Sequence, residues 1–279
     1  MFTKNGLKVP YLIYGTAWKK ETTKELTKKA ISNGFFGIDT ANQPKHYNEI
    51  LVGEALDALW QEGFRRESLF LQTKFTSIYG QDHRMPYDPS SSVRDQVHQS
   101  FQSSLKQLHV DFIDSYLLHG PTVAQGLADE DWEAWSAIEN LYEQGKAKLI
   151  GVSNVNAEQL ELLIEKAKIK PMVVQNRCYA IRGWDSSVRA VCASQDIIYE
   201  GFSLLTANVP YLQLPVVSTI AKKMKLSVPQ LVFTFAKQQG IVSLTGTNDE
   251  AHMKQDLDAM NYELFPEDAE TILNIKSFV

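Results

Sequence analysis

Cysteine is scarce in this sequence of 279 residues. Its two cysteines, Cys178 and Cys192, have no histidine or further cysteine at metal-ligand spacing, which argues against a zinc site and against a disulfide framework. We therefore expect two buried thiols and no bound metal.

Positive charge and long apolar runs are also lacking. The chain carries 28 basic and 33 acidic residues, for a net charge of -5, and has no long run of lysines and arginines. Without a basic field, nucleic acid and membrane surfaces are poor partner hypotheses. No apolar stretch is long enough to span a bilayer, and the first residues do not resemble a signal peptide, so we expect a cytoplasmic protein.

No Pro/Gly/Ser-rich linker divides the chain, so we expect a single domain over residues 1–279. Short β-branched or aromatic runs alternate with longer segments of helical period, which is typical of parallel strands joined by helical crossovers. Eight such runs predict an α/β fold, a (β/α)₈ TIM barrel. The expected strands are 11–16, 35–39, 69–74, 112–119, 148–154, 172–176, 197–202 and 241–247.

The segments outside these strands complete the barrel. Asn5-Gly6 predicts a short N-terminal hairpin, and residues 265–278 predict an extra C-terminal helix. The clearest helices between strands are expected at 23–34, 48–63, 92–109, 131–146 and 156–168. Asp131 is expected to cap the fourth of these helices and Gly145 to end it, while Asn156 and Gln159 form a plausible capping pair for the fifth.

Three ionisable residues stand at predicted strand ends: Asp39, Lys74 and His119. The C-terminal strand ends of a barrel surround one mouth, so these side chains are expected to meet. An ammonium held by a carboxylate stays charged and lowers the pKa of a neighbouring phenol, which would make a tyrosine a usable general acid.

Six ordered segments resemble the aldo-keto reductases, and the similarity covers essentially the whole chain: GFFGIDTA, YNEILVGEAL, LQTKF, DSYLLHG, GVSN and SVPQLVFTFAKQQGIVSLTGT. The resemblance implies a barrel in which a nicotinamide nucleotide delivers hydride to an aldehyde or ketone. It also implies a catalytic Asp, Tyr, Lys and His. Asp39, Lys74 and His119 match three of these positions, with His119 orienting the substrate carbonyl.

The tyrosine position does not match cleanly, because the segment DTANQPKHYNE has two residues more than the family pattern. Tyr47, the only tyrosine there, directly precedes Asn48-Glu49 and is our expected proton donor. His46 is the alternative acid.

The resemblance also implies cofactor contacts. Ser153, Asn154 and Gln175 match residues that bind the nicotinamide carboxamide, and Phe202 matches the aromatic residue that stacks on the nicotinamide. Ser203 and Leu205 follow on the pyrophosphate side.

Gly246 and Thr247 form a turn before a helix, where free amides and the helix dipole favour phosphate. The cations that many relatives use for the extra phosphate of NADP are absent, with His252 and Lys254 as the nearest substitutes. We expect NADP(H) to be favoured narrowly over NAD(H). Trp18 matches a position that lines the substrate pocket.

The leading hypothesis is therefore an NAD(P)H-dependent carbonyl reductase or alcohol dehydrogenase acting on a small-molecule carbonyl substrate, as a monomer or weak oligomer. The alternative is a nucleotide-binding regulatory subunit of the same fold with little catalytic activity. A third hypothesis is an unrelated barrel lyase or aldolase that uses Lys74 as a Schiff-base nucleophile.

Overall fold

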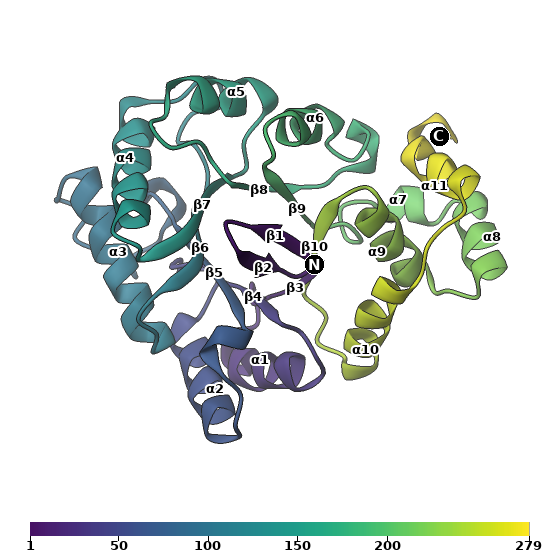
Figure 1. Cartoon of the computed structure of the whole chain (residues 1–279), viewed down its shortest axis with the longest axis horizontal. Coiled ribbons are helices and arrows are strands. Elements are labelled where there is room, and N and C mark those ends of the chain that lie inside the picture. The colour runs from purple at the N-terminus through teal and green to yellow at the C-terminus, as the bar shows by residue number, and fades with distance from the viewer. Residues whose placement is uncertain (279) are drawn as a thin grey trace.

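The computed structural model describes residues 1–278, in which a closed parallel barrel is surrounded by helices (Figure 1). The strands pair around the barrel in the order β10-β3-β4-β5-β6-β7-β8-β9, so all eight expected strands are confirmed. Their bounds are β3 Leu12–Gly15, β4 Gly37–Asp39, β5 Phe70–Phe75, β6 Ile113–Leu118, β7 Ala147–Ser153, β8 Val173–Arg177, β9 Ile198–Phe202 and β10 Ile241–Thr245.

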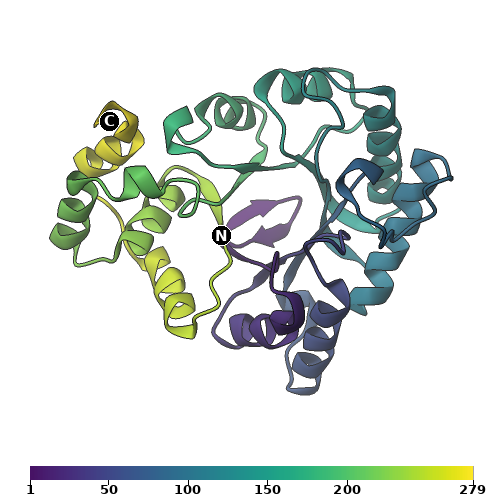
Figure 2. The same cartoon turned by 180° about the vertical axis from the view of Figure 1, so that it is seen from behind.

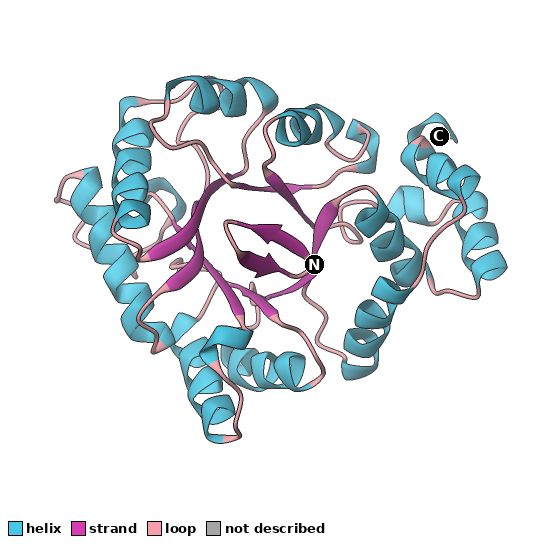
Figure 3. Ribbon diagram, in the orientation of Figure 1, coloured by secondary structure: helices cyan, strands magenta, loops and turns pink. Residues whose placement is uncertain are grey.

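Helices form a layer around the barrel (Figure 3), and those that follow the strands bury one apolar face in the core. In the helix that follows β5, for example, Val97, Phe101 and Leu108 recur at helical spacing and are completely buried. The α-helices are α1 Thr23–Ser32, α2 Glu49–Gln61, α3 Val93–Leu108, α4 Asp129–Glu143, α5 Ala157–Lys166, α6 Ser186–Ser194, α7 Val209–Leu212, α8 Pro215–Met224, α9 Val228–Gln238, α10 Glu250–Asp258 and α11 Pro266–Leu273.

The N-terminal hairpin is confirmed and closes one end of the barrel. Strands β1 (Phe2–Lys4) and β2 (Leu7–Val9) are antiparallel, and both turn residues are left-handed, with φ of 50° at Asn5 and 77° at Gly6. This geometry is that of a tight two-residue turn. Val9 packs inside the barrel with Phe70 and Ile198, at the start of β5 and β9, so the hairpin covers the N-terminal end of the strands.

The barrel interior changes from apolar to polar along the strands. Near the hairpin it is filled by an apolar layer, which includes Val9, Phe70 and Ile198. Further toward the C-terminal ends, a polar layer follows, formed by Asp39, Gln72, Lys74, Gln175 and Glu200, all of them buried. Because side chains alternate along a strand, residues 70, 72 and 74 of β5 all point inward.

Two predicted helix features are confirmed and one is wrong. Asn156 and Gln159 form a reciprocal capping pair at α5, and Gly145 follows α4 with a left-handed φ of 70°. Asp131 is not the N-cap residue of α4, because the helix begins earlier, at Asp129; it is the third helical residue, and its side chain accepts the N–H of the N-cap residue Ala128. Its carboxylate also accepts the backbone N–H of Thr122, which ties the preceding loop to the helix.

The C-terminal helix α11 lies at the periphery of the molecule, beside α7 and α8 in both views (Figures 1 and 2). Lys223 of α8 forms an ion pair with Asp268 of α11 at 2.9 Å, and the Trp184 indole donates a hydrogen bond to the carbonyl of Ile272. The two cysteines are buried and unpaired, as expected. Within residues 1–278, no helix has both the length and the apolar character needed to cross a membrane.

Candidate active site

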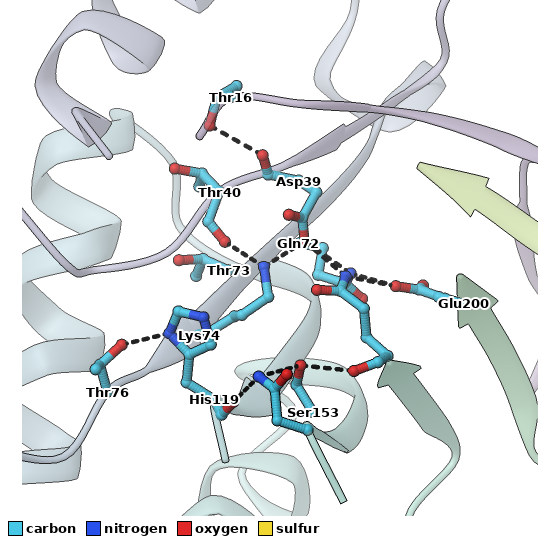
Figure 4. A network of polar contacts seen from close by, with 12 residues as sticks. Thr16, Asp39, Thr40, Gln72, Thr73, Lys74, Thr76, His119, Ser153 and Glu200 are labelled. Carbon is cyan, nitrogen blue, oxygen red and sulfur yellow. Dashed lines mark hydrogen bonds and ion pairs between the residues drawn. The ribbon is translucent and has the colours of Figure 1, made fainter. Parts of the chain in front are cut away.

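A buried ion pair lies at the C-terminal ends of β4 and β5. Lys74 Nζ is 2.5 Å from Asp39 Oδ1 and donates a second hydrogen bond to the carbonyl of Thr40 at 2.8 Å (Figure 4). Lys74 is completely buried and Asp39 is 3% exposed. A charge this deep is costly unless it is paired, and here each of the two residues is the other's partner.

Tyr47 reaches this pair from the lengthened loop after β4. The N–H groups of His46 and Tyr47 both bond to the carbonyl of Gln43, so a turn takes up the additional residues. Asn48 then caps α2 by accepting the N–H of Leu51. The Tyr47 ring centroid lies 5.6 Å from Lys74 Nζ.

The acidity of Tyr47 differs from the sequence expectation. Burial, followed by the negative charge of Asp39, raises the pKa of Tyr47 well above its usual value, whereas we expected the lysine to lower it. The Lys74 ammonium does not reverse this rise, because Asp39 sits 2.5 Å from it and compensates its charge. Tyr47 is thus a phenol that keeps its proton at neutral pH.

His119 completes the group. Its ring centroid is 6.1 Å from that of Tyr47, in an edge-on arrangement, and its Nδ1 is 2.6 Å from Thr76 Oγ1. Burial, then the charges of Lys74 and His46, lower the pKa of His119 to about 3, so its imidazole is neutral at physiological pH. The structure therefore brings together all four residues of the expected catalytic group.

These residues adjoin a cavity of about 720 Å³ at the C-terminal ends of the strands. Asp39, Tyr47 and His119 line it, whereas Lys74 lies behind Asp39 and does not. Every predicted cofactor and substrate residue lines the same cavity. These are Trp18, Ser153, Asn154, Gln175, Phe202, Ser203, Leu205, Gly246 and Thr247.

Trp18 and His46 form one rim of the cavity. Trp18 is 66% exposed, and its ring centroid lies 3.9 Å from that of His46. The backbone N–H of Trp18 donates to the carbonyl of His46, and His46 Nδ1 is 2.9 Å from Gln43 Oε1. Burial and the charge of Lys45 lower the pKa of His46. His46 is therefore held in place by three contacts.

Asn154 and Gln175 line the cavity and use their amide NH₂ groups as donors to other protein groups. Asn154 Nδ2 donates to the His119 carbonyl and to Ser153 Oγ, while Gln175 Nε2 donates to two buried carboxylates. Their oxygens, Asn154 Oδ1 and Gln175 Oε1, accept no hydrogen bond from the described residues. Two acceptors suit a carboxamide NH₂ group, which has two donors.

Phe202 and the residues after it form a further wall. Phe202 ends β9, and the guanidinium of Arg177 lies 5.3 Å from its ring centroid. The next residue, Ser203, has a left-handed φ of 57°, which turns the chain along the cavity toward Leu205. An aromatic ring that lines the same cavity as two amide side chains matches the surroundings expected for a nicotinamide.

The turn after β10 differs from the sequence expectation of free amides. Asp249 caps α10 by accepting the N–H of His252, and the N–H of Asp249 donates to Thr247 Oγ1. Two amides at this helix start are therefore occupied, and a carboxylate stands where the dipole would favour phosphate.

Lys19 supplies a positive charge that the sequence analysis missed. Its side chain is 9% exposed, lines the cavity, and donates to the carbonyl of Gly246 and to Asn248 Oδ1, the latter at 2.6 Å. In the sequence, Lys19 and Lys20 directly follow Trp18, and two adjacent lysines in a loop are normally expected to be exposed to solvent. Only the fold reveals that the loop after β3 lies beside the turn after β10, since the two strands are neighbours.

The chain matches the model of the Aldo/keto reductase family over residues 11–276. It is 32% identical over 271 residues to a glyoxal reductase of Bacillus subtilis (strain 168), covering 96% of this chain and 89% of the relative. A crystal structure of an aldo-keto reductase from a deep-sea metagenome library superposes with a TM-score of 0.83 at 28% identity, covering 98% and 94% of the two chains.

A further solved relative, an aldo-keto reductase in complex with NADPH, has a TM-score of 0.83 at 25% identity and covers 98% and 86% of the two chains. The match of nearly the whole sequence, the closed barrel and these relatives agree. The protein belongs to the aldo/keto reductase family, whose members are oxidoreductases that use nicotinamide cofactors.

Proposed function

We propose that this protein reduces aldehydes or ketones to alcohols with NAD(P)H and that Tyr47 donates the proton. The observation that carries the proposal is the grouping of a protonated phenol, a neutral imidazole and a buried Asp39–Lys74 pair at one end of the cavity. When bound, the nicotinamide supplies the hydride that the carbonyl carbon accepts.

The chain's own residues then supply the proton and the surrounding charge. His119, whose Nδ1 is engaged by Thr76, offers Nε2 to the carbonyl oxygen and orients it. Tyr47 transfers its phenolic proton to that oxygen as the alcohol forms. The Lys74 ammonium, 5.6 Å from the tyrosine ring centroid, stabilises the phenolate that is left.

Asn154 Oδ1 and Gln175 Oε1 fit the cofactor's carboxamide, and Phe202 fits the face of its ring. Lys19, beside Gly246, would hold the cofactor's phosphates. This assignment predicts that Lys19→Ala weakens nucleotide binding about tenfold, as expected for the loss of a charge-assisted contact.

The test is nucleotide oxidation with a panel of aldehydes and ketones. Tyr47→Phe should lower kcat/KM by about 10²- to 10⁴-fold, the usual contribution of a general acid, with nucleotide Kd unchanged. His46→Ala should keep most of the activity, because His46 is held by Trp18 and Gln43. Near-normal reduction by Tyr47→Phe together with loss in His46→Ala would assign the proton to His46.

Two other functions fit the geometry less well. A Schiff base requires Lys74 to reach the substrate, but Lys74 is fully buried, paired with Asp39, and absent from the cavity wall. A regulatory nucleotide-binding subunit does not need Tyr47 and His119 at the cavity wall with a buried Asp39–Lys74 pair beside them. Absence of turnover with any carbonyl and either nucleotide would favour the regulatory subunit.

We propose a small preference for NADP(H) over NAD(H), with dissociation constants that differ by less than about tenfold. Lys19 and His252 line the cavity and favour the extra phosphate, whereas Asp249 opposes it. Asp249→Asn keeps a good capping residue and removes the charge, so it should tighten NADPH binding and leave NADH binding unchanged. Equal tightening of both nucleotides would rule out this role for Asp249.

A further inference from the structure

Glu200 is a carboxylate enclosed within the barrel, in the otherwise uncharged strand β9. Its side chain is completely buried, and its Oε2 accepts hydrogen bonds from Gln72 Nε2 at 2.6 Å and Gln175 Nε2 at 2.8 Å (Figure 4). These amides are the only hydrogen-bond partners of the carboxylate among the described residues. A buried charge without a cation in contact is costly, so its presence calls for an explanation.

The same two amides also bind the catalytic pair. Gln72 Nε2 donates to Asp39 Oδ1 at 2.9 Å, and Gln175 Nε2 donates to it at 3.0 Å. An amide NH₂ has two hydrogens, so each glutamine gives one to Asp39 and one to Glu200. Asp39 Oδ1 therefore has three donors, two of which it shares with Glu200, while the third is Lys74.

The charges in this group balance only when Glu200 is protonated. Asp39 and Lys74 cancel each other, so an ionised Glu200 leaves one uncompensated negative charge inside the barrel. Glu200 Oε1 and Gln72 Oε1 are both buried acceptors without a partner. A proton on Glu200 Oε1 turns one of these two acceptors into a donor and lowers the cost of burial.

We propose that Glu200 is a positioning residue for the Asp39–Lys74 pair, and that its proton determines how much of the Lys74 charge is available to Tyr47. The proposal rests on the proposed carbonyl reduction. Glu200 does not line the cavity, so it acts through its hydrogen bonds with Gln72 and Gln175 and through the effect of its charge on Asp39 and Lys74.

The surroundings of Glu200 place its pKa near neutral pH. Burial raises the pKa of Glu200 to about 7, with Asp39 adding to the rise and the two amides and Lys74 opposing it. The ionisable groups that face it are Asp39 from β4 and Lys74 from β5, because β8 contributes the neutral Gln175 and β10 the apolar Val242.

The direction of the effect follows from charge. Below pH 7 the protonated Glu200 leaves the ammonium of Lys74 balanced by Asp39 alone. Above pH 7 a second carboxylate competes for Lys74, so the phenolate that forms on Tyr47 is less stabilised. The rate of the reductive step should fall by about tenfold as pH rises through 7, the effect of one pKa unit on a general acid.

The experiment is single-turnover reduction of an aldehyde between pH 5.5 and 8.5, in wild type and Glu200→Gln. Glutamine has the shape of the protonated acid and keeps both hydrogen bonds, but it cannot ionise. The variant should match the wild-type rate at pH 5.5 and lose the fall near pH 7. An unchanged pH profile in Glu200→Gln would overturn the proposal.

Glu49 provides the matched control. It is also buried, and burial raises its pKa to about 7, but it bonds to Thr73 and Ser104 on the outer side of β5. Its charge also acts on Lys74, so it is the rival source of a titration near pH 7. Glu49→Gln should keep the wild-type inflection. If Glu49→Gln abolishes the inflection and Glu200→Gln does not, Glu49 is the group responsible.

Infrared spectroscopy gives a readout that does not depend on turnover. Glu49 and Glu200 should both contribute protonated-carboxyl absorption that disappears near pH 7, so the Glu200 band is read from the difference between the Glu49→Gln spectrum and that of the Glu49→Gln/Glu200→Gln double variant. Gln72→Met removes one donor to Glu200, so both the band and the kinetic inflection should move together to higher pH. An inflection that stays in place while the band moves would contradict the proposed coupling.

These measurements separate the two proposals. A wild-type protein that reduces no carbonyl contradicts the proposed function, and the infrared titration then still tests Glu200. An active wild type whose carboxyl band near pH 7 is unchanged by Glu200→Gln contradicts the role of Glu200 alone.

Discussion

The apolar and polar layers of the barrel interior are built on the same strands, and they differ in what each contributes. On β5, Phe70 faces the hairpin, whereas Gln72 and Lys74, two and four residues further on, face the Asp39 network. The apolar layer contributes stability through buried area, while the polar layer is costly to bury and positions charge for chemistry. Within five residues, a single strand thus passes from the apolar layer to the polar layer of the candidate active site.

The largest effect is expected from the polar layer. Lys74→Met should lower kcat/KM by about 10³-fold, because the phenolate of Tyr47 loses its cation. It also leaves Asp39 buried without its ion-pair partner, which lowers the free energy of unfolding. The double variant Asp39→Asn/Lys74→Met should recover stability but not activity, measured by denaturant unfolding and steady-state kinetics. Lys106→Met, at an exposed position of α3, is the control.

The apolar layer should respond in the opposite way. Phe70→Ala should lower the free energy of unfolding by about 3–5 kcal/mol, through lost burial and a cavity, with little change in the rate per folded molecule. Phe36→Ala, at a position that is 47% exposed, should change it by less than about 0.5 kcal/mol. A large rate loss in folded Phe70→Ala would mean that the two layers are not separable.

The protonation of Glu200 is expected to affect the stability of the folded state. Its pKa rises on folding from the ordinary value of 4.5 to about 7, so the folded state binds the proton more tightly than the unfolded state. Its contribution is therefore fully present below pH 4.5 and is lost as pH rises toward 7, at a cost of roughly 2–3 kcal/mol. Glu200→Gln should flatten this part of the pH dependence in urea unfolding. A curve parallel to that of wild type would show that Glu200 does not titrate there.

The smallest effect is expected at the edge of the polar layer. Thr76→Val removes the hydroxyl that bonds to His119 Nδ1 and frees the imidazole to change tautomer, so kcat/KM should fall by about tenfold. Thr76→Ser should restore the rate. Thr27→Val, whose hydroxyl is buried in α1 without a partner, is the control for the substitution itself.

The sequence predicts the fold, and it predicts that Asp39, Lys74 and His119 lie close together because the C-terminal ends of all barrel strands surround one mouth. It also singled out Tyr47, which the structure places beside Lys74, although its role as acid stays a prediction. It could not predict the contact of Lys19 with the turn at Gly246, which depends on the path of a loop.

The role of Glu200 was missed for a different reason. A charged residue within IIYEGF, a strand with both faces covered, was a visible conflict with burial. Periodicity reveals that such a side chain points inward, but the donors that satisfy it come from β5 and β8, far away in sequence. Hydrogen-bond partners between distant strands are set by barrel register, which composition and spacing do not encode.

The position of the hairpin makes the N-terminus a suitable point for attaching the protein to a fusion partner or a solid support. It covers the N-terminal ends of the strands, while the cavity opens at their C-terminal ends. Lys4 of the hairpin is paired with Asp196 just before β9, which anchors this end to the barrel. A fusion partner or solid support joined at residue 1 would therefore face away from the cavity entrance and leave it free for substrate.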